Sequence, residues 1–276
     1  MAVIEQRLQG LTDAEFGKAE KQYRIASTLQ AVVTLLAASS VFVTDQRLSL
    51  LVAIATLAVF GLWANIDWAY KDTRLQAERG RKALWIADGL GDSLSKPERR
   101  DVEAGFHCTD EEGRAAENPE YFASKSPPGD KRLTELIEES GFYSCRLLRH
   151  SAKWAWTRLI LGGAVALGLL LSAILVGSSG QTVVIARLVC TALVFFIGNE
   201  VLGAAKGYDR AVEVLSKLQA RVAAIRATGY PSGDLLLLFA DYNAAVEGAP
   251  MMAPGVYDRH QARLDDLWRR HLESEG

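Results

Sequence analysis

The chain has 276 residues, of which 49% are hydrophobic and 23% charged, and its net charge is −2 at pH 7. This near-neutral balance gives no support to a nucleic-acid-binding tail, so we expect neither DNA nor RNA as a partner. Three cysteines, Cys108, Cys145 and Cys190, lack CxxC spacing, which argues against a disulfide framework and a zinc site. These averages fit a soluble domain as well as a small bundle of membrane spans, so the distribution along the chain must decide between them.

The N-terminal segment, residues 1–24, contains acidic and basic residues without an early apolar core. We therefore expect a cytoplasmic helix and no cleaved signal peptide. Thr12 and Glu15 have the spacing of a capping box, which predicts that a helix begins there. Two apolar blocks follow, separated by a short turn at Asp45 to Arg47, and they predict a first transmembrane hairpin over residues 25–66.

The middle segment, residues 67–157, begins as a continuation of the second span. Apolar and small residues from Trp63 to Ala87 recur at steps of three and four, a pattern typical of a seam that packs on another helix. Gly89 and Gly91 are expected to end this helix. Residues 92–130 are polar and turn-rich, so we expect one irregular regulatory or ligand-binding loop there.

A second transmembrane hairpin is expected over residues 158–204. Its first half contains about 20 residues without an ionisable side chain, the length needed to cross about 30 Å of hydrocarbon. Trp154, Trp156 and Arg158 precede it, as suits the headgroup layer. The alternative is a buried core helix of a soluble protein. Small residues recur every fourth position on one face, so another helix could approach closely: Ala164, Gly168 and Ser172.

Residues 205–276 are expected to form a cytoplasmic helical segment. A second seam runs from Tyr208 to Ile225, and a final helix is expected from Tyr257 to about Ser274. The turns between paired spans hold one basic residue, Arg47, so the positive-inside rule places both termini in the cytoplasm. The sequence thus predicts an all-α membrane protein, with four transmembrane helices in two antiparallel pairs and long cytoplasmic helical extensions.

No enzyme motif occurs in the sequence. The GxGxxG, GxxxxGK[ST], HExxH and GxSxG patterns are missing, so we expect a protein that is not an enzyme and that uses no cofactor. The histidines, including His107 beside Cys108, have no recognisable ligand spacing. We therefore expect solvated or locally hydrogen-bonded histidines and no metal site.

The densest polar cluster surrounds the start of the helix that leads into the third span. A basic face there could bind phosphate through charge-assisted hydrogen bonds. The alternative is a basic collar that faces anionic lipid head groups, which we favour for Lys153 and Arg158. The candidate ligand-binding residues are Tyr121, Lys125, Lys131, Arg132, Arg146 and Arg149.

Three polar residues near the fourth span are candidates for a pore or its gate. A charge at the bilayer centre costs at least about 2.5 kcal/mol, so Arg187 and Glu200 should each face a partner helix, water or the interface. They lie about 20 Å apart along a helix and cannot pair within one chain. Snorkelling of Arg187 to the outer surface is the simpler interpretation for that residue. Asn199 and Glu200 could ring the inner mouth of an oligomeric pore.

Three strings stand out beside the layout of the spans: RLQAERGRKALWIADGLG at residues 74–91, YFASKSPPGDKRLTELIEESGFYSCRLL at residues 121–148 and LLLLFADYNAAVEGAPMMAPGVYDRH near the C-terminus. The layout itself has two paired spans with minimal outer turns, a large middle segment and a helical C-terminal segment with a late proline–aromatic element. In these strings and this layout the chain resembles the SMODS and SLOG-associating four-transmembrane effectors of bacterial antiviral systems, which implies a place in a bacterial inner (cell) membrane.

The resemblance implies a homo-oligomeric effector that disrupts or perforates the lipid bilayer in response to a cyclic or linear nucleotide second messenger. A different class of function remains open, namely a membrane scaffold or accessory subunit that has no pore and recruits a cytoplasmic partner. An enzyme that acts on lipid is a more distant alternative.

Overall fold

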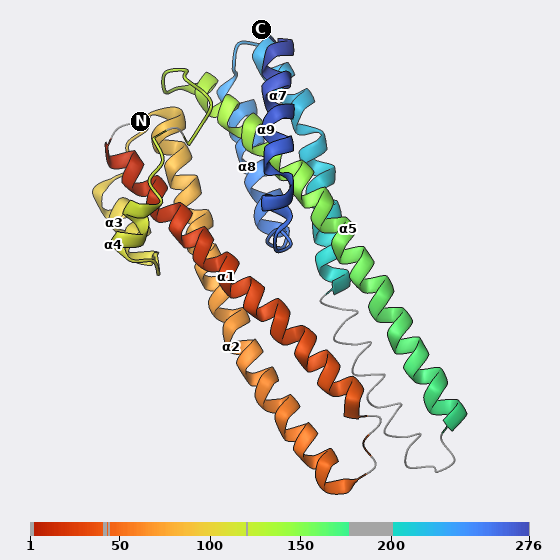
Figure 1. Ribbon diagram of the computed structural model, residues 1–276. Helices are drawn as coiled ribbons and strands as arrows, with labels where there is room; N and C mark the ends of the chain where they lie inside the picture. Colours follow the sequence, from red (N-terminus) through yellow and green to blue (C-terminus); the bar gives the residue numbers. More distant parts are fainter. Residues whose placement is uncertain (1–2, 41–42, 44, 120, 177–200, 276) are drawn as a thin grey trace. The chain divides into compact units, whose positions relative to one another are not determined.

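The computed structural model describes residues 3–40, 43, 45–119, 121–176 and 201–275 (Figure 1). These residues form helices and connecting loops, and no strand occurs among them, which confirms the all-α prediction. The chain divides into two compact units. The first unit comprises Met1–Lys21, Tyr70–Ser151 and Gly207–Gly276, and the second comprises Gln22–Ala69 and Ala152–Lys206.

Three long helices have residues in both units: α1 (Val3–Ser40), α2 (Gln46–Leu84) and α5 (Asp130–Val176). None of them contains a proline, so no backbone N–H is missing from their ladders. The α2 helix continues directly into a π-helical turn, η1 (Trp85–Leu90), which ends at Gly91 with a φ of 78°. This left-handed conformation suits glycine and explains the predicted stop.

The predicted start of the first helix is wrong. The α1 helix begins at Val3, and Thr12 lies in its interior, where its hydroxyl donates to the carbonyl oxygen of Leu8 at 2.8 Å. Glu15 does not reach back to the helix backbone. It is fully buried and accepts hydrogen bonds from the backbone N–H groups of His107 and Cys108.

The expectation of one irregular loop over residues 92–130 is also wrong. Two short helices occupy part of it, α3 (Lys96–Gly105) and α4 (Asp110–Ala115). The side chain of Ser95 accepts from the N–H of Glu98 at the start of α3, and Thr109 and Glu112 form a capping box on α4. The cap residues are the clearest local signal of such short polar helices.

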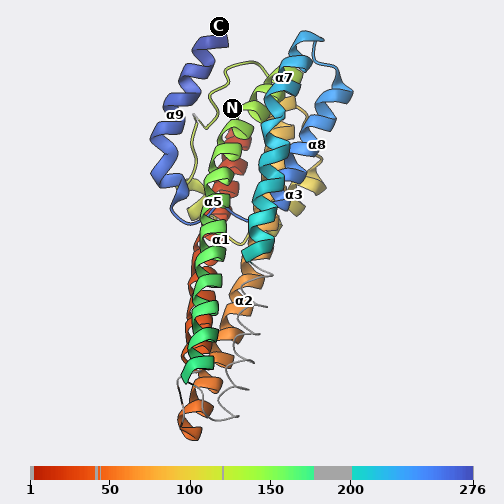
Figure 2. The ribbon, with the colours of Figure 1, turned by 90° about the vertical axis from the view of Figure 1, so that its right-hand side faces the viewer.

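The C-terminal part of the first unit is also helical, as expected. Residues 201–216 are helical, of which 207–216 belong to the first unit, and α7 (Leu218–Ala227), α8 (Ser232–Gly248) and α9 (Val256–Glu275) follow. The α7 and α8 helices lie side by side in both views (Figures 1 and 2). The predicted seam is confirmed as a buried row, since each of its residues is at most 4% exposed: Tyr208, Ala211, Leu215, Leu218, Val222 and Ile225.

Aromatic side chains form much of the core of the first unit. Trp85 of η1 is 1% exposed and stacks on Tyr242 of α8, with ring centroids 5.0 Å apart. Phe142 of α5 packs on Trp268 of α9, also with centroids 5.0 Å apart. The α2 seam faces this core from Tyr70 to Leu84, where its residues are buried as predicted.

The second unit, unlike the first, exposes many large apolar side chains. Among the described residues, one helix, Gln46–Leu90, is long and apolar enough to cross a membrane, and no residue of its most apolar stretch is buried. Large apolar side chains are also exposed on the parts of α1 and α5 that belong to this unit, such as Leu35 and Ile160. Most of the predicted fourth span, with Arg187, Asn199 and Glu200, lies outside the described residues.

Candidate functional site

The first unit contains a pocket whose outer wall is the loop at residues 116–129, called here the pocket loop. Hydrogen bonds attach this loop to α1 and α5. The N–H of Asn118 donates to Oε1 of Gln9 at 2.8 Å, and the hydroxyl of Ser124 donates to Oε2 of Glu135 at 2.6 Å. Its end is attached to η1 by the N–H of Gly129, which donates to the carbonyl oxygen of Gly89 at 2.8 Å. The described residues of this loop are therefore bonded to three helices despite their irregular backbone.

Arg132 holds the two walls of the pocket together. It lies in the first turn of α5, and its residue surface is 8% exposed. Its Nη2 donates to Oδ2 of Asp88 in η1 at 2.7 Å, while Nη1 donates to the carbonyl oxygens of Ser124 and Ser126 at 3.0 and 2.9 Å. Most of the N–H groups of this guanidinium are thus used within the protein, so its main contribution is to the shape of the pocket.

The pocket has a volume of about 460 Å³, which lies within the range of sites for small molecules. Phe122 and two prolines supply apolar wall, and serines supply hydroxyl groups. Lys125 is an exposed cation at its edge, with no ion pair among the described residues. The lining residues are Glu5, Ala87, Asp88, Gly91, Pro119, Phe122, Ser124, Lys125, Ser126, Pro128 and Arg132.

The structure brings two of the six predicted ligand-binding residues, Lys125 and Arg132, to this pocket. The others lie elsewhere: Tyr121 hydrogen-bonds Asp13, Lys131 is exposed with its Nζ 3.9 Å from Glu135, Arg146 lies over the Phe142 ring at 3.4 Å, and Nη2 of Arg149 donates to Sγ of Cys145 at 3.8 Å. The helical spacing of Arg146 and Arg149 was a sound reason to place them on one face, but the pocket loop does not reach them.

Two partly buried carboxyl groups bind the pocket loop. Burial raises the pKa of Asp13, which bonds Tyr121, to about 6. Burial also raises the pKa of Glu139 to about 7, although the N–H of Ala123 donates to this carboxylate at 3.2 Å and opposes the change. The attachment of the loop therefore includes two groups that change protonation near neutral pH.

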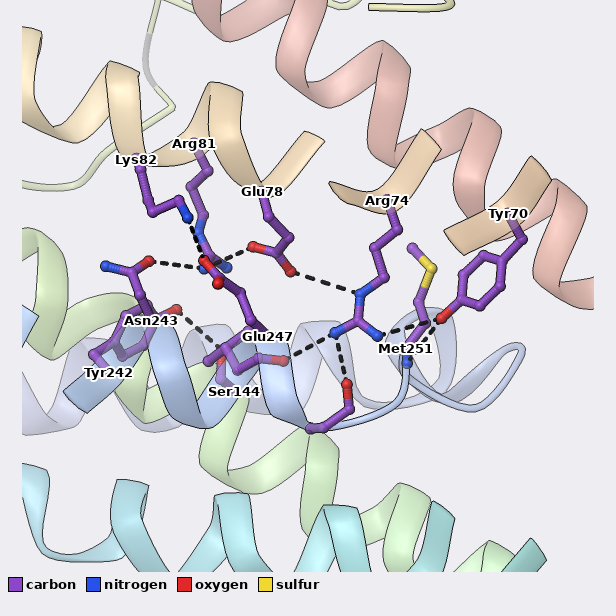
Figure 3. A network of polar contacts seen from close by, with 12 residues as sticks. Tyr70, Arg74, Glu78, Arg81, Lys82, Ser144, Tyr242, Asn243, Glu247 and Met251 are labelled. Carbon is purple, nitrogen blue, oxygen red and sulfur yellow. Dashed lines mark hydrogen bonds and ion pairs between the residues drawn. The ribbon is translucent and has the colours of Figure 1, made fainter. Parts of the chain in front are cut away.

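A second polar cluster, which the sequence reasoning missed, joins α2 to α8 (Figure 3). Oε2 of Glu78 lies 2.7 Å from Nη2 of Arg81, and Oε1 lies 3.7 Å from Nε of Arg74. Arg81 also donates to Oδ1 of Asn243 at 3.0 Å, and its guanidinium lies 5.3 Å from the Tyr242 ring centroid. The spacing of these α2 residues at i, i+3 and i+4 was visible in the sequence, but their burial and their partners on α8 were not.

A third cluster surrounds His107. Its Nδ1 lies 2.8 Å from Oε1 of Glu15, and its Nε2 lies 3.2 Å from Oδ2 of Asp72. The expectation of a solvated or locally bonded histidine therefore misses two partners that are distant in sequence. Burial raises the pKa of the neighbouring Cys108 to about 12, so this thiol is protonated at neutral pH and is not an activated nucleophile. No group of three or more metal-ligating side chains occurs in the described part of the chain.

Comparisons with protein-family models, with curated proteins and with solved structures found no match to this chain.

Proposed function

We propose that the second unit is embedded in a lipid bilayer, and that the chain crosses it four times through the hairpins at residues 25–66 and 158–204. The observation that carries this proposal is the exposure of large apolar side chains: Leu35, Leu57 and Ile160 expose 69%, 70% and 67% of their surface. A buried core helix would cover such side chains, whereas hydrocarbon solvates them without penalty. Continuous helices also satisfy their own backbone hydrogen bonds, as a bilayer requires.

Aromatic residues at the edge of the second unit support this placement. Trp68 is 80% exposed on α2, and Trp156 is exposed on α5. The guanidinium of Arg158 lies over the Trp154 ring, 4.4 Å from its centroid. Such amphipathic groups suit the headgroup layer, here on the cytoplasmic side of a bacterial inner membrane, with both termini in the cytoplasm.

The function that fits best is an oligomeric membrane effector that opens or disrupts the bilayer when an anionic ligand binds the first unit, as in antiviral defence. A cyclic or linear nucleotide suits the pocket because Lys125 offers a cation for phosphate and Phe122 offers apolar surface for a ring. Helix α5 carries pocket residue Arg132 and also continues into the second unit, so it provides a direct connection. Assembly is supported by Gly168, since no described atom lies within 4 Å of a Cβ built there and a glycine on a helix face lets another helix approach closely.

A second function is favoured by a different observation. Leu236 and Leu237 on α8 are 57% and 62% exposed, although the first unit otherwise buries most of its large apolar side chains. Two adjacent exposed leucines suit a partner protein, as expected of a membrane scaffold or accessory subunit without a pore.

The test is nucleotide-dependent dye release from liposomes that contain the purified protein. We expect release on addition of one member of a panel of cyclic and linear oligonucleotides, with no release from empty liposomes. Lys125→Ala should weaken the response because it removes the exposed cation of the pocket. Lys131→Ala is the matched control, since Lys131 is also exposed, on the first turn of α5, but does not line the pocket.

The two functions predict different results in this assay. An effector releases dye, and its response to nucleotide is weakened in the Lys125 variant but not in the Lys131 variant. A scaffold releases no dye with any nucleotide, and this result would reject the pore.

A further inference from the structure

The loop at residues 249–255, between α8 and α9, is bonded to three helices at once; it is called here the clasp loop. The hydroxyl of Tyr70 on α2 accepts from the N–H of Met251 at 3.3 Å, and the hydroxyl of Tyr208 donates to the Met251 carbonyl oxygen at 2.5 Å. Oγ of Ser151 on α5 accepts from the N–H of Ala253 at 3.0 Å. Each of the three helices thus supplies one hydroxyl group to the backbone of this loop.

The three hydroxyl-bearing residues all lie where the chain passes between the first and the second unit. Tyr70 and Ser151 are the first and last residues of one stretch of the first unit, and Tyr208 is the second residue of another. Each of their helices continues from there into the second unit. At the same level, a Cβ on Gly207 would lie 3.0 Å from Cδ of Pro250, so the loop and this helix are in close contact.

No residue of the clasp loop is exposed, which is uncommon for a loop because irregular backbone needs partners for its polar groups. Ala249 and Ala253 are each 2% exposed, and Tyr208 and Ser151 are fully buried. Loss of one hydroxyl leaves a buried N–H or C=O group without its partner, and such a group is costly. The loop is therefore stable in its docked position. Positions in which only some of these hydrogen bonds are made are costly, so the loop is either docked or released.

A continuous set of contacts within the first unit leads from the pocket to the clasp loop. Asp88, which lines the pocket, lies in η1 with Trp85, and Trp85 stacks on Tyr242 of α8. One turn after Tyr242, at the C-terminal end of α8, Nη2 of Arg74 donates to the carbonyl oxygens of Val246 and Ala249, at 2.9 and 2.6 Å (Figure 3). A shift of η1 on ligand binding would thus reach α8 and its following loop through packed groups.

We propose that the clasp loop holds the three helices together where they leave the first unit, and that its release is the conformational step that changes the state of the membrane segments. This inference rests on the proposed function. The docked loop corresponds to the resting state, and a ligand acts by favouring the released loop through its differential affinity for the two states. Weakening the clasp should therefore mimic the ligand.

The test compares clasp variants with matched controls in the full-length protein in liposomes. Tyr208→Phe and Ser151→Ala each remove one hydroxyl, and Tyr143→Phe removes a hydroxyl that bonds Asp265 elsewhere in the first unit. A second pair acts by steric contact. Gly207→Val pushes on Pro250, and Gly203→Val is its control because no described atom lies near a Cβ on Gly203. Circular dichroism identifies any variant that fails to fold. If the hydroxyl variants fail to fold, the glycine variants provide the test, and the reverse also holds.

Two measurements are made on each variant. Hydrogen exchange should accelerate about fivefold or more at the amides of Met251 and Ala253, because a lost hydrogen bond of this kind lowers the local opening free energy. Exchange should also accelerate at residues 67–69 and 152–157, directly beyond the clasp. Dye release should occur without nucleotide in the clasp variants and not in the controls.

The outcomes separate the clasp from the proposed function. If no nucleotide releases dye from wild-type liposomes, the pore is rejected, and exchange at residues 67–69 and 152–157 still decides whether the clasp restrains the helices. Unchanged exchange there, in a variant whose clasp loop exchanges faster, would overturn the clasp. The clasp is also rejected if wild type responds to nucleotide while a loosened clasp neither releases dye nor changes the nucleotide dependence.

Discussion

The two units use the same helices in opposite ways. In the first unit, α2 buries Tyr70, Ala77 and Leu84, and it withdraws the charged pair of Glu78 and Arg81 from solvent. In the second unit, the same helix exposes its leucines and has no charged side chain between Leu48 and Ile66. The two units therefore differ in which kind of side chain is buried. The first unit buries charged side chains, and the second unit exposes apolar ones.

This comparison shows that exposure has to be interpreted together with chemistry. In water, an exposed leucine is common and an isolated buried charge is costly. A contiguous surface of exposed leucines, isoleucines and valines is different, because it would aggregate in water and is stable in hydrocarbon. The experiments below therefore remove polar side chains that the first unit withdraws from solvent, and place a charge at an exposed leucine of each unit.

The largest effect is expected from Arg132→Ala in the first unit. The change leaves Asp88 buried without its cation and removes two hydrogen bonds to the pocket loop, so we expect destabilisation of about 3–5 kcal/mol. Chemical denaturation in mild detergent measures it. Lys131→Ala, on the neighbouring exposed side chain, should change stability by less than about 0.5 kcal/mol. The double variant Arg132→Ala/Asp88→Ala should recover part of the loss, and equal stability of wild type and Arg132→Ala would contradict the structural role of Arg132.

The comparison of the units is sharpened by placing one charge at two exposed leucines of α2. Leu57 in the second unit is 70% exposed and Leu75 in the first unit is 61% exposed. Leu57→Asp should cost about 3 kcal/mol of membrane insertion because a carboxylate near mid-bilayer is poorly solvated. Leu75→Asp should have no effect on insertion, because that residue faces water. Resistance to alkaline extraction from membranes measures the difference, and equal extraction of the two variants would contradict a lipid-facing second unit.

A smaller, pH-dependent effect is expected from Glu139 in the first unit. Its pKa rises from 4.5 to about 7 on folding, so between these pH values the folded state binds more protons than the unfolded state. Its contribution to stability is therefore fully present below pH 4.5 and is lost as the pH rises through 7. Glu139→Gln removes the cost of a buried charge and should stabilise the protein at pH 8 by about 1–3 kcal/mol, with little change at pH 4.5.

Denaturation midpoints between pH 4.5 and 8 test this prediction. The midpoint should depend less steeply on pH in the Glu139→Gln variant. The dependence that remains between pH 4.5 and 6 should be sensitive to Asp13→Asn, because the pKa of Asp13 is also raised by burial. A Glu139→Gln variant with the wild-type pH dependence would show that this carboxyl group is not buried in its neutral form.

Local patterns in the sequence were sufficient to determine the helical class and several boundaries. Steps of three and four predicted the buried seams from Tyr70 to Leu84 and from Tyr208 to Ile225, since helical periodicity reports directly on the face that is buried. The stop at Gly91 was also predictable, because a left-handed residue at a helix end favours glycine. The short α3 and α4 helices were missed, although the cap residues Ser95 and Thr109 signal them locally.

Only the tertiary structure decided which polar residues meet. Arg132 was a candidate for ligand binding in the sequence, and its guanidinium bonds Asp88, 44 residues away. Glu15 had the spacing of a cap, and its carboxylate holds the backbone of His107, 92 residues away. A side chain's charge and helical phase are local properties and can be read from the chain. Its partner depends on which distant segment packing brings beside it, because a buried polar group must be bonded wherever the fold places it.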